Sequence, residues 1–338
     1  MTRTILEMEG FDYMTSITSP RFNSPSGGTI VTGRNSGSAG QFLGSGSGAT
    51  LAFAGIPQGD RIIFGFAFKV PSGTMGVDFA RINDTGGTTH LIYSISATGI
   101  ISVTRNSVSL TGATGTTNLT TGIWYYLEFE QIISDTVGEI HCYLDGIQEF
   151  STASNLDTQN GGTGIINAFT PTSNNNRTIQ VDDIYIRSAT AGETQKTSFL
   201  GDVRVSGLLP TGAGNSAQFT PSAGSNYQNV DDTAADGDST YNESSTLNHI
   251  DSFVFADLPS TGTVYAVQSQ VMARKTDAGT RSVASVYRIS STNYVGIDNT
   301  LSVDYNYEID LKELSPATAA AWTVSEINSA EFGYKLTV

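Results

Sequence analysis

A chain of 338 residues is long enough for two domains, each with a core of useful size. Its 32 acidic residues against 17 basic ones give a net charge of −15, which argues against binding to nucleic acid or to anionic lipid. The single cysteine, Cys142, excludes an internal disulfide, so packing alone must hold the fold together.

The first residues of the chain lack the apolar stretch of a secretion signal. Glu7, Glu9 and Asp12 occupy the positions where that stretch would lie, so we expect no signal peptide and folding in a reducing cytoplasm. The longest strongly apolar run, residues 62–68, lies between Arg61 and Lys69 and is too short to cross a bilayer. We therefore expect no insertion into a membrane.

Strand patterns dominate the first half of the chain. Every even position of residues 62–70 carries a large apolar side chain, and this period of two predicts a half-buried strand. Residues 124–133 repeat the alternation. Residues 139–150 follow as two strands joined by Asp145 and Gly146, a pair that supplies the positive φ angles of a two-residue turn, so Leu144 should pair with Ile147. We interpret residues 178–187 as the last strand of a first domain.

The second half of the chain also shows strand patterns, which begin after a segment poor in large apolar residues. Residues 188–198 contain almost no large apolar side chain and are the best candidate for a linker. Further strands are predicted over residues 199–205, 251–258, 263–274, 281–289 and 302–311. The one predicted helix begins near Thr323, where Glu326 completes a capping box. The sequence thus predicts an all-β protein of two β-sandwich domains, 1–190 and 199–338, with a linker over 191–198.

Three motifs of the predicted first domain resemble a known sandwich. The sequence GIWYY at residues 122–126, followed after a gap by CYLDG at 142–146, is similar to the laminin-G and concanavalin-like jelly rolls, and VDDIYI at 181–186 resembles their last strand. This resemblance covers roughly residues 1–190 and implies a jelly-roll sandwich for the first domain.

A second resemblance extends over the whole chain. A family of bacteriophage virion proteins with a concanavalin-like domain is similar to this sequence in EGFD at 9–12, GDVRV at 201–205, DSTY at 238–241, ARKTDAG at 273–279, PAT at 316–318, AWT at 321–323 and EFG at 331–333. The resemblance implies a structural protein of the virion that is assembled in the host cytoplasm. We expect a tail-associated position (fibre, collar or adhesin), a homo-oligomer in contact with other virion proteins, and a surface that can face a host glycan. The alternative position is decoration of the capsid head.

An alternative function from another class is glycoside hydrolysis. Glu308, Asp310 and Glu313 match the E-x-D-x-x-E signature of laminarinase-like glycosidases, which implies Glu308 as nucleophile, Asp310 as helper and Glu313 as acid. Lys312 stands where those enzymes carry an apolar residue, and two Trp in the whole chain are few for a sugar cleft. We therefore expect an acidic edge strand and no enzymatic activity. A free glycan-binding module is the third alternative.

Candidate calcium ligands lie in one acidic loop. Asp232, Asp236 and Glu243 fall at ligand positions of a calcium loop, and Asp238 is a further candidate, but Ala234 replaces a ligand. We expect a solvated acidic turn and no cofactor, with calcium as the alternative.

The remaining candidate ligands are isolated in the sequence. Asp182 and Asp183 are an acidic pair that by itself defines no site. The three histidines, His90, His141 and His249, lack metal-ligand spacing. Alternation places His141 on the outer face of its strand, beside a buried Cys142.

Overall fold

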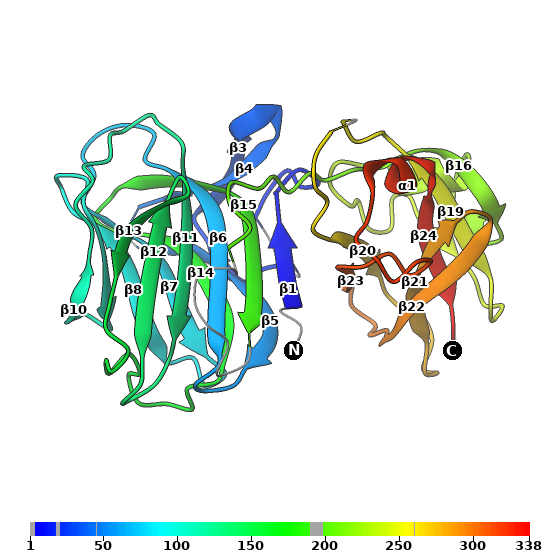
Figure 1. The fold of residues 1–338 in the computed structure, drawn as a ribbon. Coiled ribbons are helices and arrows are strands. Elements are labelled where there is room, and N and C mark those ends of the chain that lie inside the picture. The colour runs from blue at the N-terminus through cyan, green and yellow to red at the C-terminus, as the bar shows by residue number, and fades with distance from the viewer. Residues whose placement is uncertain (1–3, 18–20, 45, 190–198, 260) are drawn as a thin grey trace. The chain divides into compact units, whose positions relative to one another are not determined.

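The computed structural model describes residues 4–17, 21–44, 46–189, 199–259 and 261–338 (Figure 1). The chain divides into two compact units, Met1–Asp12 with Ser16–Ser206 and Tyr13–Thr15 with Gly207–Val338. Residues 199–206, which the sequence analysis assigns to the second domain, therefore belong to the first unit. The predicted linker, 191–198, lies outside the described residues.

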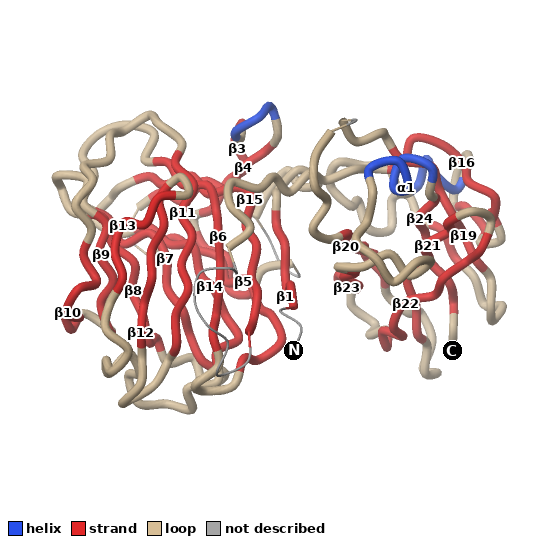
Figure 2. Tube along the Cα trace, in the orientation of Figure 1, coloured by secondary structure: helices blue, strands red, loops and turns tan. Residues whose placement is uncertain are grey.

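Two sheets face each other in the first unit (Figures 1 and 2). The eight-stranded sheet has the order β13-β12-β11-β6-β15-β4-β3, with β1 paired to β15, and the seven-stranded sheet has the order β10-β9-β8-β7-β14-β5-β2. The strands are β1 (Thr4–Glu9), β2 (Asn23–Ser26), β3 (Gly28–Thr32), β4 (Ser38–Leu43), β5 (Ser47–Ile56), β6 (Arg61–Lys69), β7 (Val77–Asp84), β8 (Thr89–Ile95), β9 (Ile101–Arg105), β10 (Val108–Thr114), β11 (Tyr125–Ile132), β12 (Glu139–Leu144), β13 (Ile147–Ser151), β14 (Ile166–Ser173) and β15 (Thr178–Ala189), with a 3-10 turn at Arg34–Ser36.

Aromatic side chains from both sheets fill the core of this sandwich. Phe64 of the eight-stranded sheet lies 4.9 Å from Phe169 and 5.2 Å from Tyr93 of the other sheet, measured between ring centroids. The even positions of β6 point into this core, as the alternation predicts. The expectation of a half-buried strand is nevertheless wrong, because Ile63 and Ala67 on the opposite face are also buried.

The hairpin and the last strand of the first unit form as predicted. Leu144 pairs with Ile147 across the turn, where Asp145 and Gly146 have φ angles of 49° and 78°. Strand β15 spans Thr178–Ala189 and lies between β6 and β4. Cys142 is fully buried, as expected for a packing residue.

The second unit is a smaller β structure (Figure 2). Its five-stranded sheet has the order β16-β19-β24-β21-β22, and β20 pairs with β23 and β17 with β18 in two-stranded sheets. The elements are β16 (Pro210–Ala217), β17 (Thr220–Pro221), a 3-10 turn at Asn226–Asn229, β18 (Asn242–Glu243), β19 (Ile250–Phe255), β20 (Val267–Ala273), β21 (Ser282–Ile289), β22 (Thr292–Thr300), β23 (Asn306–Lys312), α1 (Val324–Ser329) and β24 (Glu331–Leu336).

The second unit confirms four of the five strands predicted there. Strands β19, β20, β21 and β23 lie within or close to the predicted ranges. The strand predicted over residues 199–205 is wrong, since that segment pairs with no strand and lies in the first unit. Helix α1 begins after Thr323, whose hydroxyl accepts a hydrogen bond from the Glu326 amide at 3.1 Å. No helix in the described part of the chain is long and apolar enough to span a membrane.

Candidate functional site

The outer face of the eight-stranded sheet carries an unusual set of buried polar side chains. Side chains alternate along a strand, so the residues next to the core-facing phenylalanines of β6 and β11 point to the opposite face. On β6, β11 and β12, the polar residues of this face that are at most about a tenth exposed are Arg61, Glu128, Glu130, Glu139 and His141. Glu130 pairs with His141 across β11 and β12, and Glu139 lies two positions from His141 on the same strand.

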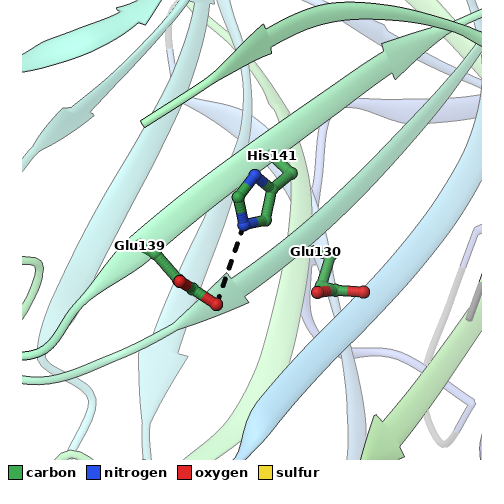
Figure 3. A group of neighbouring side chains, drawn as sticks. All are labelled: Glu130, Glu139 and His141. Atoms are coloured by element: carbon green, nitrogen blue, oxygen red, sulfur yellow. Dashed lines mark ion pairs between the residues drawn. The ribbon is translucent and has the colours of Figure 1, made fainter. Parts of the chain in front are cut away.

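Four of these residues form what we call the acid–histidine cluster: Arg61, Glu130, Glu139 and His141. The Arg61 guanidinium forms ion pairs with both carboxylates, with Nη1 at 2.8 Å from Glu130 Oε1 and in contact with Glu139 Oε1. His141 Nε2 lies 3.7 Å from Glu139 Oε1, and Figure 3 shows this ring nitrogen directed at the carboxylate. His141 Nδ1 lies 2.7 Å from Ser151 Oγ.

Burial determines the charge of this cluster. Removal of His141 from water lowers its pKa and outweighs the opposite effects of Glu139 and Glu130, so the imidazole is neutral at pH 7. Two carboxylates then share one guanidinium. With both carboxylates ionised, the cluster carries one net negative charge. This charge is buried, because His141 and Glu130 are each 1% exposed.

Residues 199–206, which we call the covering segment, pack on a neighbouring part of the same face. The amide of Leu200 donates to Tyr185 Oη at 3.2 Å, and that of Gly201 donates to Glu128 Oε1 at 2.9 Å. The ring of Phe199 lies 4.6 Å from that of Tyr143. Burial raises the pKa of Glu128, although its hydrogen bonds act in the opposite direction. The face that alternation alone assigns to solvent is thus partly occupied by the chain itself.

Arg34 fastens the covering segment to the sheet. Its Nε lies 2.6 Å from Asp183 Oδ2, and its Nη2 donates to the carbonyl of Val203 at 2.6 Å. The amide of Val205 donates to Asp183 Oδ1 at 2.7 Å. Burial and the neighbouring Asp183 raise the pKa of Asp182 to about 8. This acidic pair therefore holds Arg34 and backbone amides of its own chain.

The hydrolase candidates lie at strand β23 of the second unit. Asp310 is 3% exposed, and Lys312 Nζ lies 2.8 Å from its Oδ1. Burial raises the pKa of Glu308. Glu308, Asp310 and Lys312 alternate onto one side of the strand, whereas Glu313 follows its end. The residue that departs from the glycosidase signature, Lys312, thus neutralises the carboxylate that the signature assigns as helper.

The calcium candidates are engaged with other side chains. The hydroxyl of Thr240 donates to Asp236 Oδ2 at 2.9 Å and to Asp232 Oδ2 at 3.3 Å. Asp238 accepts from Arg274 Nη2 at 2.9 Å and from Tyr305 Oη at 2.8 Å. Glu243 lies in β18. Within the described ranges, one group of three or more potential metal ligands converges, and it is Glu130, Glu139 and His141.

The sequence reasoning missed this group. The three histidines lack metal-ligand spacing among themselves, whereas the partners of His141 are carboxylates. The signal was present in Glu139-x-His141, because a spacing of two places both side chains on one face of a strand. Pairing the strand with residues 124–133 would have brought Glu130 opposite His141.

No protein-family model and no curated protein matches the chain. Among solved structures, domain 4 of an extracellular arabinanase from Geobacillus stearothermophilus, in complex with arabinotriose, is 14% identical, with 56% of this chain and 94% of that chain covered and a TM-score of 0.37. The alginate lyase Aly36B is 12% identical over 56% of this chain and 98% of its own, with a TM-score of 0.37. A Trypanosoma rangeli sialidase in complex with the inhibitor DANA is 15% identical, with 47% of this chain and 26% of that chain covered and a TM-score of 0.31. At these identities and TM-scores, the ligands of the three proteins carry no argument about what this chain binds.

Proposed function

We propose that this chain is a structural protein of a bacteriophage particle, associated with the tail and assembled as a homo-oligomer. The observation that carries the proposal is the placement of two of the motifs that resemble those of virion proteins, because these two motifs contact each other. Gly10 of EGFD lies against Val205 of GDVRV, so closely that a side chain at position 10 would collide with the Val205 carbonyl. Residues 201–205 supply most of the bonds of the covering segment. These motifs therefore build and close a sandwich, which is the work of structural residues.

The environment of Asp310 favours this proposal over glycoside hydrolysis. A retaining glycosidase needs two carboxyl groups about 5 Å apart on either side of an open sugar site. Asp310 is buried beside Gly296 and paired with Lys312, so the middle of the acidic motif faces its own protein. We accordingly propose no enzymatic role for Glu308, Asp310 and Glu313.

An exposed strand edge supports self-association. Strand β22 ends the five-stranded sheet, and its Val295 and Ile297 are 45% and 56% exposed. An apolar edge strand is a ready template for another chain. Since only 14% of the residues are charged, copies can cover such surfaces without burying many unpaired charges.

Mass spectrometry and immunogold labelling of gradient-purified particles test the proposal. We expect the protein in intact particles, with label on the tail, alongside a known capsid protein as the positive control and a cytosolic host protein as the negative control. Label on head faces would move the proposed position to capsid decoration.

A protein found only in the lysate would contradict the structural proposal. Release of reducing sugar from β-glucans that is lost in Glu308→Gln would then identify a hydrolase. Glycan binding without turnover would identify a free binding module.

A further inference from the structure

Three buried atoms of the acid–histidine cluster have no hydrogen-bond partner. They are His141 Nε2, Glu130 Oε2 and Glu139 Oε1, the last of which contacts Arg61 as an ion pair. Leaving a polar atom without a partner in a protein interior is costly, so native proteins rarely tolerate several at one place. His141 and Glu130 are each 1% exposed and Glu139 is 2% exposed, which limits rescue by bulk water. The arrangement therefore calls for a ligand.

The contact with Ser151 orients the histidine as a ligand would require. A neutral imidazole donates from one ring nitrogen and accepts at the other. In the tautomer whose Nδ1 donates to Ser151 Oγ, 2.7 Å away, Nε2 presents a lone pair toward Glu139, and a bound cation would select this tautomer. Metal-binding histidines are commonly fixed in this way, through a hydrogen bond from the ring nitrogen that does not bind the metal.

The separations fit a shared cation better than a hydrogen bond. The 3.7 Å between His141 Nε2 and Glu139 Oε1 is too long for a hydrogen bond. Two ligands at about 2.1 Å from one tetrahedral metal ion lie ~3.4 Å apart. Ligand atoms from Glu130, Glu139 and His141 all lie within 4.8 Å of one another, so small side-chain movements would bring all three to one ion.

We propose that Glu130, Glu139 and His141 form a binding site for a small divalent transition-metal ion of the zinc type. The ion would bind His141 Nε2, Glu139 Oε1 and Glu130 Oε2, with water in the fourth position. Imidazole nitrogen favours zinc over the hard ions calcium and magnesium, which prefer oxygen. The bound ion would cross-link β11 and β12, two strands that already pair, and would stabilise this strand pair.

Arg61 is compatible with the ion as a support for one of its ligands. It holds Glu130 through Oε1, which leaves Oε2 available, and ligating carboxylates are commonly hydrogen-bonded in this manner. Two carboxylates and one guanidinium sum to a single negative charge, and a divalent ion would change this sum to a single positive charge. Arg61 also contacts Glu139 Oε1, so the ion would share that oxygen with the guanidinium or displace it.

A second buried histidine of the first unit provides a matched control. His90 Nε2 also has no hydrogen-bond partner and lies 3.6 Å from Asp84 Oδ2. Asp84, however, is already satisfied, because the amides of Thr163, Thr88 and Gly86 donate to its two oxygens. No second carboxylate joins the pair in a group of three within the described residues. His90 therefore should not bind a metal ion.

Zinc binding to the untagged full-length chain tests the proposal. Protein refolded with zinc chloride, then freed of loose metal by gel filtration, is expected to retain one ion per chain by elemental analysis and to melt at a higher temperature than protein refolded with chelator. X-ray absorption should show only nitrogen and oxygen neighbours at about 2.0–2.1 Å. His141→Gln should weaken binding at least ~10-fold, whereas His90→Gln should leave it unchanged.

Three outcomes would overturn the site. They are no retained zinc in the wild type, equal retention by wild type and His141→Gln, and loss of binding in His90→Gln alone. Circular dichroism checks that each variant is folded. If His141→Gln does not fold, Glu139→Gln replaces it, because the amide keeps the shape of the side chain and removes its charge. The outcome is independent of whether the protein is found in a phage particle.

Discussion

Asp182, with its neighbour Asp183, shows how the pKa of one buried residue can make folding stability depend on pH. Both carboxyl groups are buried, and Asp182 accepts hydrogen bonds from the amides of Asp183 and Arg34 at 2.8 and 3.1 Å. Burial raises the pKa of Asp182 to about 8, with the charge of Asp183 adding to the effect. Between its ordinary pKa of 3.8 and about 8, Asp182 keeps its proton in the folded chain and loses it in the unfolded chain.

Asp182→Asn tests this coupling. Protonation of Asp182 stabilises the folded state below pH 3.8, and that contribution is lost as the pH rises through about 8. The stability of the wild type relative to Asp182→Asn should therefore fall between pH 5 and 8, by at most about 1.4 kcal/mol per pH unit. Calorimetry of both proteins across this range measures the difference. The exposed Asp135→Asn controls for the loss of one acidic residue, and a pH-independent difference would contradict the prediction.

Residue roles were predictable where they depend on local geometry alone. Burial of Cys142 and the turn at Gly146 follow from alternation and from the φ angles that a two-residue turn requires. The environment of His141 was not predictable in this way. Alternation correctly assigns it to the face opposite the core, but does not predict that the residue is only 1% exposed there. Alternation carries no information about what covers a face.

At the scale of elements, the hairpin between β12 and β13 depends on its turn. Gly146 has a φ of 78°, and no atom lies within 4 Å of where its Cβ would be, so any cost of a side chain there comes from the backbone. Asp145 adds a bond, since its Oδ1 accepts from the Tyr126 amide at 2.7 Å. The turn thus ties β11 to the hairpin as well as closing it.

Gly146→Ala should destabilise the first unit by about 1 kcal/mol, because alanine is strained at a positive φ angle. Gly212→Ala is the matched control: position 212 also has open space around its Cβ but lacks the positive φ angle. That variant should be neutral or slightly more stable. Urea denaturation compares the two, and equal effects would show that loss of glycine as such, and not the turn conformation, determines the cost.

Element prediction succeeded where large apolar residues alternate and failed where they do not. Strands β6, β11 and β21 have clear apolar positions and were predicted. Strand β16 has the sequence PTGAGNSA, and its small and polar side chains give no period-two signal. Residues 199–205 have the opposite problem. Their apolar side chains predict a strand, but Phe199, Leu200 and Val203 pack on the face of a sheet instead of pairing with its edge.

At the scale of the molecule, the covering segment determines where the first unit ends. The sequence alone predicts that the second domain starts at residue 199, after the stretch with few large apolar residues. The contacts place it at Gly207, because the segment bonds to Tyr185, Glu128, Arg34 and Asp183 of the first unit. Composition locates the break in apolar residues but not the unit to which the following residues belong.

Calorimetry of the full chain can distinguish these two boundaries. Each unit has its own core, so we expect two unfolding transitions. Phe199→Ala removes a half-buried ring from the first unit and should lower only one transition, by about 1–2 kcal/mol, which is less than a fully buried phenylalanine would cost. Trp322→Phe removes the bond from Trp322 Nε1 to the Lys312 carbonyl and should lower only the other transition. If both variants lowered the same transition, residue 199 would belong with the second unit, and the boundary drawn from composition would be correct.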